Sequence, residues 1–345
     1  MSTGGPAFSA ADLSKYGLGR GARPMLAREA DSVYWMARYV ERAEHIARLL
    51  RIKLNLLADT GDLEDELLEW LWRVVPRVFR LPDGAGGLAA GPVETLGARV
   101  VSFMTFDPAN SNSLFCCLTQ ARENARGVRE TISAEMWEEL NSIYWSIRAD
   151  DARQRFDESP DAFLNSVVSA SMLFQGLTDQ TIRHDQRWQF TQLGKYIERI
   201  DFTCRVVSLH WQILTQAEDL LDLPLQNIHW MGLLRSCCSI EAYRKSQLAE
   251  IDGLRVVSYL TLEESFPRSV RYAVRGAANA IAAVREESDA RKADAVQRIL
   301  GRLDAQLEYA ELSELVAEGV PQYLARIESE VSSVALALQR GYFLH

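Results

Sequence analysis

Two separate segments of the chain occur twice at nearly the same distance, and this internal repeat constrains the fold more than any other feature. Residues 97–108 (GARVVSFMTFDP) align with residues 253–264 (GLRVVSYLTLEE), with six of twelve positions identical and an offset of 156. Residues 39–44 (YVERAE) align with residues 196–201 (YIERID) at an offset of 157. Such self-similarity indicates a duplicated structural unit. Two packed copies are expected about a pseudo-twofold axis, so that equivalent residues face each other.

Apolar residues recur at three- and four-residue steps along most of the chain, which is the period of an amphipathic helix. Helix breakers lie between these stretches, and Pro76 is expected to kink or end its helix. Only short runs such as residues 99–103 alternate polar and apolar residues with the period of a strand. The sequence therefore predicts an all-α multi-helix bundle built from two tandem, pseudo-twofold-related repeats. The predicted helices span residues 31–58, 63–79, 113–132, 134–147, 162–181, 186–216, 228–250, 269–287, 293–315 and 321–339.

The repeat and the helical pattern together predict the domain organisation. Residues 1–24 are rich in small residues and are predicted to form a flexible tail. Residues 25–150 form the first repeat, residues 151–182 a connecting helix, and residues 183–345 the second repeat. With 48% hydrophobic residues, the chain is expected to bury a substantial core.

Charge and cysteine usage exclude several classes of protein. The net charge of −9 argues against nucleic-acid binding, because neutralising phosphates needs a basic face. The chain contains no run of about 18 apolar residues, which is the length needed to cross a bilayer. The N-terminal residues also lack the apolar run of a signal peptide. The five cysteines lack CxxC spacing and are interpreted as reduced core residues. The sequence thus predicts a cytoplasmic protein that binds neither nucleic acid nor membrane.

A charged motif interrupts the apolar pattern of one helix in each repeat. Acids and bases three or four positions apart share one helix face. In the first copy this face carries Glu41, Glu44, His45 and Arg48, with Arg42 one step around. In the second copy it carries Glu198, Asp201 and Arg205, with Arg199 one step around.

The motif has two main interpretations. In the structural one, Glu41 pairs with Arg199 and Glu198 with Arg42 across the pseudo-axis, while Glu44–Arg48 and Asp201–Arg205 pair within their helices; buried pairs of this kind specify register. In the functional one, the motif lines a cleft between the copies. Glu41 or Glu198 would then act as a general base, and the arginines would hold a carboxylate or phosphate.

A metal site is a third interpretation of the same residues. Carboxylate-bridged metal pairs in helical bundles use Glu-x-x-His from each of two helices. In the first copy, Glu41 is followed by Glu44 three positions later and by His45 four positions later. In the second copy, Phe202 occupies the position that corresponds to His45. The sequence therefore predicts no metal and no cofactor of the protein's own.

A run of arginines occurs in the first copy only. Arg122, Arg126 and Arg129 lie on one helical stripe, and Glu123 and Asn124 lie beside them. Such a run is usually a solvated face with Arg-Glu pairs. Because the second copy lacks it, with Ala278-Asn279 in place of Arg122-Glu123, the run is also a candidate site for one asymmetric ligand.

Four segments resemble the bacterial alpha-E domain family: residues 30–44, 120–126, 193–201 and 266–271. This resemblance implies a helical fold whose Glu-Arg motif maps onto Glu41-Arg42 and Glu198-Arg199. Members of the family are typically encoded beside a circularly permuted ATP-grasp protein and a transglutaminase-like protein. The resemblance thus implies a role in making or modifying peptide or amide bonds, with these two proteins as candidate partners.

Two hypotheses about function follow. The chain has no Gly-rich phosphate loop, GxSxG or HExxH motif. The first hypothesis is therefore an accessory or substrate-binding component of an amide-forming system, which uses ATP only through a partner ATP-grasp protein. The alternative is an enzyme in its own right, acting on an amino acid or peptide amide through the Glu/Arg cleft between the repeats.

Overall fold

The computed structural model describes residues 25–59, 65–82, 84–88, 91–216, 223–246, 251–287 and 290–343. The predicted tail, residues 1–24, lies outside these ranges, as do residues 63–64 and 247–250 of two predicted helices. The described residues form helices and no strand, which confirms the all-α prediction. No described helix is both long and apolar enough to reach across a membrane.

The helices fall into two successive sets. The first set is α2 (Ala27–Asp59), α3 (Asp65–Val78), α4 (Leu96–Phe106), α5 (Leu114–Gly127), α6 (Ala134–Arg148), α7 (Ala152–Glu158) and α8 (Pro160–Thr181), with short η1 (Ala85–Gly87) and η2 (Val93–Thr95) before α4. The second set is α9 (Gln186–Gln216), α10 (Leu223–Ser236), α11 (Ile240–Ser246), α12 (Gly253–Leu262), α13 (Val270–Glu287), α14 (Ala290–Glu308), α15 (Leu312–Glu318) and α16 (Val320–Leu338), followed by the π-helical turn η3 (Gln339–Phe343).

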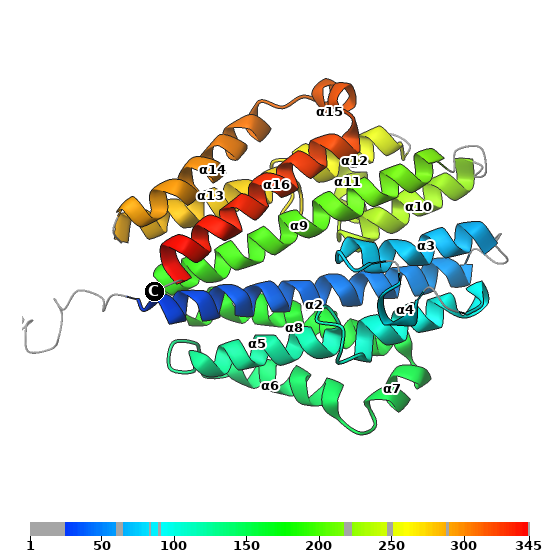
Figure 1. Cartoon of the computed structure of the whole chain (residues 1–345), viewed down its shortest axis with the longest axis horizontal. Coiled ribbons are helices and arrows are strands. Elements are labelled where there is room, and N and C mark those ends of the chain that lie inside the picture. Colours follow the sequence, from blue (N-terminus) through cyan, green and yellow to red (C-terminus); the bar gives the residue numbers. More distant parts are fainter. Residues whose placement is uncertain are drawn as a thin grey trace, which may run out of the picture.

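The long helices α2 and α9 lie side by side in the middle of the molecule (Figure 1). Helices α5 and α8 pack on α2, and α13 and α16 pack on α9. The two central helices approach closely at Gly194, where an added Cβ would lie 2.3 Å from the backbone oxygen of Tyr34 and 3.3 Å from the Cβ of Ala37. A glycine is needed there because the backbone of α2 occupies the space of a side chain. We call the interface between α2 and α9 the seam.

Several local features recur at equivalent places in the two sets. Helices α3 and α10 both end in a turn with a non-glycine residue at positive φ, Arg80 at 58° and Cys238 at 54°. A glycine of α4 and one of α12 each face a tryptophan, with added Cβ atoms 2.5 Å from Trp72 for Gly97 and 2.7 Å from Trp230 for Gly253. The duplication itself stays a prediction, and these pairs agree with it.

The packing of α8 bears on the predicted connecting helix. Helix α8 packs against α2 and α6, as α16 packs against α9 and α14. It begins with Ser159, whose side chain accepts from the backbone N–H of Ala162, and with Pro160 in its first turn. Helix α8 thus packs in the first set as α16, the last α-helix, packs in the second set. The predicted domain boundaries stay a prediction.

The predicted helices differ from the structure in several places. Helices α4, α7 and α12 were not predicted, and the helix predicted over 113–132 ends at Gly127. The strand-like run at residues 99–103 lies inside α4, which is buried on most sides, so apolar residues occur around its whole circumference. The helix predicted over 228–250 is divided into α10 and α11 by the turn at Cys238. The helix predicted over 293–315 is divided into α14 and α15. Pro76 lies two residues before the end of α3, as expected, and the five cysteines are free thiols.

Candidate functional site

The two Glu-Arg motifs meet across the seam in crossed pairs. Arg42 donates from Nε and Nη2 to the two carboxylate oxygens of Glu198, at 2.6 and 2.8 Å. Arg199 donates from Nε to Glu41 at 2.7 Å. Glu41 and Glu198 are only 2% and 3% exposed, so both carboxylates lie inside the protein. The predicted cross-pairing is confirmed, and we call these two pairs the Glu-Arg clasp.

On the Glu198 side, the clasp is extended by Arg38, which the sequence analysis did not include. Its Nε donates to Glu198 at 2.8 Å and its Nη2 to Asp201 at 3.0 Å. Its Nη1 donates to the hydroxyl of Tyr34 at 3.3 Å. Asp201 also forms the predicted pair with Arg205, at 3.4 Å. Arg38 precedes Arg42 by one helical turn, a spacing that could have revealed it.

On the Glu41 side, the additional cation is Arg268, from the loop before α13. It lies 3.6 Å from a carboxylate oxygen of Glu41 and donates to Glu44 at 2.8 Å. Glu44 accepts from Arg48 Nε at 2.7 Å as well, which confirms the predicted pair within α2. Gln175 of α8 donates to the other oxygen of Glu41 at 3.2 Å. The oxygens of Glu41 and Glu44 are thus engaged by side chains from α2, α8, α9 and the loop before α13.

The electrostatics of the clasp keep its acids ionised. Burial by itself would raise the pKa of Glu198, but Arg42 and Arg38 outweigh burial and hold it well below its ordinary value. Burial is likewise opposed at Glu41, where Arg199 and Arg268 lower the pKa. A general base works best with a pKa near the operating pH and with access to the substrate proton. These two glutamates have neither property.

Glu41, Glu44 and His45 offer ligand atoms within 4.8 Å of one another, so their fit to a metal ion needs to be tested. Arg199, Arg268 and Arg48 already occupy the carboxylate oxygens at hydrogen-bonding distance. A cation placed there would compete with these guanidinium groups and be repelled by them. The His45 ring stacks on Phe202 at 4.0 Å between ring centres. Both ring nitrogens of His45 lack a hydrogen-bond partner among the described residues, and Nε2 lies 3.3 Å from Glu41. The paired arginines thus argue against a metal ion at this place, and its absence stays a prediction.

The residues around the clasp differ between the two halves. Arg38 corresponds to Lys195 at the offset of 157, and Asn112 corresponds to Arg268 at the offset of 156. Asn112 accepts from Arg42 at 3.0 Å, whereas on the other side Arg199 donates to the backbone oxygen of Pro267 at 3.0 Å. The clasp is therefore symmetric in its core and asymmetric in the groups around it.

The predicted arginine run lies apart from the clasp, between α5 and α6. The Arg122 guanidinium carbon lies 4.6, 5.4 and 5.8 Å from the ring centres of Tyr144, Trp137 and Trp145, and its Nε donates to Asn141 at 2.7 Å. Arg126 pairs with Glu123 at 2.6 Å, and the Asn124 side chain bonds to the backbone. We call Arg122, Arg129, Trp137, Tyr144, Trp145 and Arg148 the arginine–aromatic patch.

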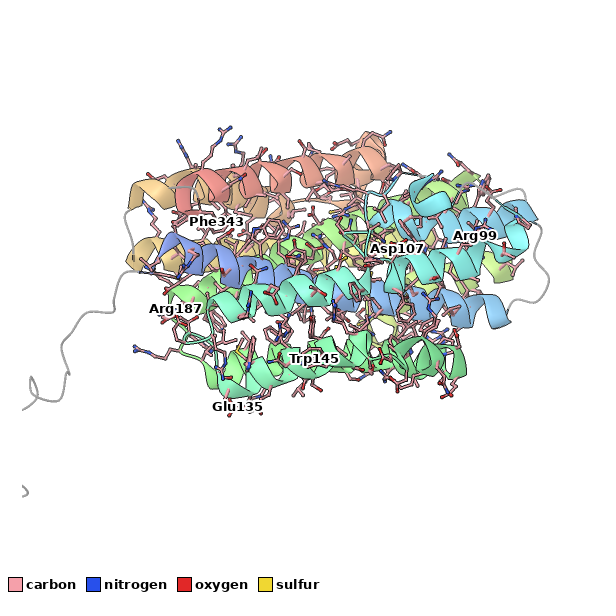
Figure 2. All side chains as sticks on the ribbon, turned by 60° about the horizontal axis from the view of Figure 1, so that its bottom comes forward. Arg99, Asp107, Glu135, Trp145, Arg187 and Phe343 are labelled. Atoms are coloured by element: carbon pink, nitrogen blue, oxygen red, sulfur yellow. The ribbon has the colours of Figure 1, made fainter. Side chains whose placement is uncertain are left out.

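The patch is accessible from outside. Trp145 is 59% exposed and lies on the face of α6 that is turned toward the viewer in Figure 2. Arg148 stacks over Tyr144 at 5.3 Å and Arg129 over Trp137 at 5.5 Å, so each arginine is held over a ring. The predicted stripe holds only in part, because α5 ends at Gly127 and Arg129 lies in the turn after it. The rings of α6 that order the arginines were not predicted.

One family model covers nearly the whole chain. The sequence matches the Alpha-E family, described as a predicted alpha-helical domain with a conserved ER motif, over residues 25–343, and the chain belongs to this family. This chain carries the sequence Glu-Arg at 41–42 and at 198–199, and these four residues form the clasp.

Relatives of the chain occur in mycobacteria. Uncharacterized proteins of Mycobacterium bovis and of two Mycobacterium tuberculosis strains are 24% identical to this chain over 259 residues. The match covers 71% of this chain and 28% of each relative, so the chain spans less than a third of their length. No solved structure gives a significant match.

Proposed function

We propose that this protein is an accessory, partner-binding component of an ATP-grasp-associated system that forms or modifies peptide or amide bonds. The observation that carries the proposal is the state of the clasp. Glu41 and Glu198 are buried, ionised and held by arginines, which suits a structural lock and not a general base. The alternative, an enzyme acting through Glu41 or Glu198, would have to break these pairs in every cycle.

The surface best suited to a partner is the arginine–aromatic patch. Tryptophan, tyrosine and arginine are the residue types that contribute most to binding energy at protein interfaces. Arginines held over rings lose little further freedom on association, which lowers the entropic cost of binding. We propose the ATP-grasp protein as the occupant of this patch, with the transglutaminase-like protein as a second candidate partner of the system.

The length of the relatives supports a role beside other domains. In the mycobacterial proteins, the segment that matches this chain accounts for 28% of the length. A helical unit of this type thus occurs within much larger chains, where it has neighbouring domains to contact. ATP would be bound by the partner, since this chain carries none of the usual phosphate-binding loops.

The test is co-purification with the ATP-grasp protein proposed as the partner, at low and at physiological salt. Trp145→Ala should weaken the association at least about tenfold, which is typical of an interface anchor. Tyr309→Ala is the matched control, because Tyr309 is 79% exposed on the other half of the molecule and lies outside the patch. Absence of association in both salts would refute the proposed function. Equal effects of the two variants would remove the patch from it.

A further inference from the structure

A pocket of about 600 Å³ opens beside the seam, between α2, α9, α16 and the turn η3. Its volume is typical of a site for a small molecule or a single side chain. Its apolar lining comes from Tyr34 and Trp35 of α2, Leu336 of α16 and Phe343 of η3, and the rings of Tyr34 and Phe343 contact each other at 5.3 Å between centres. Leu336 is 55% exposed, so this apolar lining reaches the molecular surface. An apolar or aromatic group could pack against it.

The floor of the pocket is charged and joins the clasp. Arg38 and Asp201 both line it, and they are 6% and 8% exposed. All three nitrogens of the Arg38 guanidinium are engaged, by Glu198, Asp201 and Tyr34. Arg80, at the edge of the pocket, donates to Glu328 at 3.0 Å. The arginines of this pocket are therefore already paired with acids of the protein.

Asp201 is different because half of its carboxylate is unused. One oxygen, Oδ2, meets Arg38 at 3.0 Å and Arg205 at 3.4 Å. The other, Oδ1, is buried and has no hydrogen-bond partner among the described residues. Among the described residues that line the pocket, it is the one buried side-chain oxygen or nitrogen without a partner. An acceptor left unpaired in a buried place costs free energy until a donor arrives.

A second carboxylate, Asp31, lines the same pocket two helical turns before Arg38 on α2. The pocket thus combines a missing hydrogen-bond donor and two carboxylates with the rings of Tyr34 and Trp35, over which the Arg38 guanidinium carbon already lies at 5.8 and 5.2 Å. A carboxylate hydrogen bond is strongest with a charged donor. A carboxylate or phosphate ligand would instead face Asp31 and Asp201 and find the arginines occupied.

We propose that this pocket binds a primary ammonium group carried on an apolar chain or ring, with Asp201 Oδ1 accepting the ammonium hydrogen bond. The ammonium can come from a free amine or from the lysine side chain of a protein or peptide. An amine is the nucleophile that an amide-forming reaction consumes, so the inference deepens the proposed function and rests on it for its biological meaning. Binding itself is a property of this chain alone.

Calorimetric titration of the isolated chain tests the inference. Phenethylamine, charged at neutral pH, should bind at least about tenfold more tightly than phenethyl alcohol, which has nearly the same shape and no charge. Hydrocinnamate, the anionic counterpart, should not bind. N-acetyl-lysine methylamide is the second amine: tighter binding of this compound assigns the pocket to a lysine side chain, and tighter binding of phenethylamine assigns it to a free amine. Equal binding of amine and alcohol, or no binding of either amine, overturns the inference.

Two variants connect the binding to this pocket. Leu336→Trp should fill the mouth of the pocket and abolish amine binding. Leu173→Trp is the matched control, because Leu173 is 51% exposed on α8 and lies outside the pocket. Asp201→Asn should remove the preference for amine over alcohol; should this variant fail to fold, the two leucine variants still decide. Amine binding that persists in Leu336→Trp overturns the assignment. If the chain binds the amine but does not associate with the partner, the proposed function is refuted and this inference still holds.

Discussion

Replacing Glu198 by glutamine tests whether the clasp holds the two halves together. Glu198 accepts three N–H groups: Arg38 Nε at 2.8 Å and Arg42 Nε and Nη2 at 2.6 and 2.8 Å. Glutamine has nearly the same shape, but it presents an NH₂ donor to these donors and removes the charge that compensates two guanidinium groups. Arg38 is 6% exposed, so its charge would stay inside the protein uncompensated by this carboxylate.

The expected loss of stability is large. Breaking a buried ion pair by removing one partner costs about 3–5 kcal/mol, out of a total stability of about 5–15 kcal/mol. For 345 residues, an unfolding entropy of about 2.1 cal/mol/K per residue gives about 0.7 kcal/mol/K. A loss of about 4 kcal/mol then lowers Tm by about 6 °C.

The assay is urea unfolding followed by circular dichroism, together with calorimetric melting. Glu318→Gln is the matched control, because Glu318 also accepts two N–H groups of one arginine, Arg326, at 3.1 Å each, but its side chain is 37% exposed. Exposed pairs contribute about 0–1 kcal/mol. If Glu198→Gln costs no more than Glu318→Gln, the structural interpretation of the clasp is refuted.

The same variant has a pH signature. The folded-state pKa of Glu198 lies below its ordinary value of 4.5, because Arg42 and Arg38 outweigh the effect of burial. A depressed acid pKa contributes stability that is present above the unfolded-state value and is lost as the pH falls below it. The wild-type protein should therefore lose stability below about pH 4.5 more steeply than Glu198→Gln. Parallel pH profiles of the unfolding midpoint would contradict the pKa assignment.

Two further perturbations concern the interior of the bundle. Lys53 is buried, its amine has no partner among the described residues, and burial lowers its pKa to about 8. Wild-type stability should rise between about pH 8 and 10.5 because the unfolded chain binds more protons there; Lys53→Met should abolish this rise in urea titrations, and an unchanged slope would contradict the prediction. Gly194→Ala should destabilise by about 1–3 kcal/mol through overpacking against Tyr34. Gly176→Ala, in α8 with open space around it, should stabilise the protein by about 0.5–1 kcal/mol. If both glycine variants shift the melting temperature in the same direction, the close approach of α2 and α9 at Gly194 is unimportant for stability.

The sequence predicted most of the fold because long amphipathic helices carry a strong periodic signal. It failed at α4, where burial on most sides removes the contrast between faces. It also failed at the end of α10, where Cys238 adopts a positive φ that is usually given to glycine. Neither glycine nor proline marks that turn, so no residue type announced it.

The clasp was predictable for a different reason. Cross-pairing followed from the repeat, since equivalent helices about a twofold axis bring each Glu next to the other copy's Arg. Arg268 was missed because it lies 224 positions from Glu44 along the chain, and no local spacing connects them. The pocket beside the seam depends on α16 and η3, which reach it only through the tertiary packing.

The crossed pairs also have an evolutionary consequence. Each half supplies the acid that neutralises an arginine of the other half, so a half alone would expose unpaired charges. If the chain arose by duplication, as the repeat predicts, the ancestral unit carried both members and met this need by self-association. In a homodimer every substitution appears twice, whereas a fused chain can change one side only. On this prediction, the differences between Arg38 and Lys195 and between Asn112 and Arg268 would have become possible after fusion.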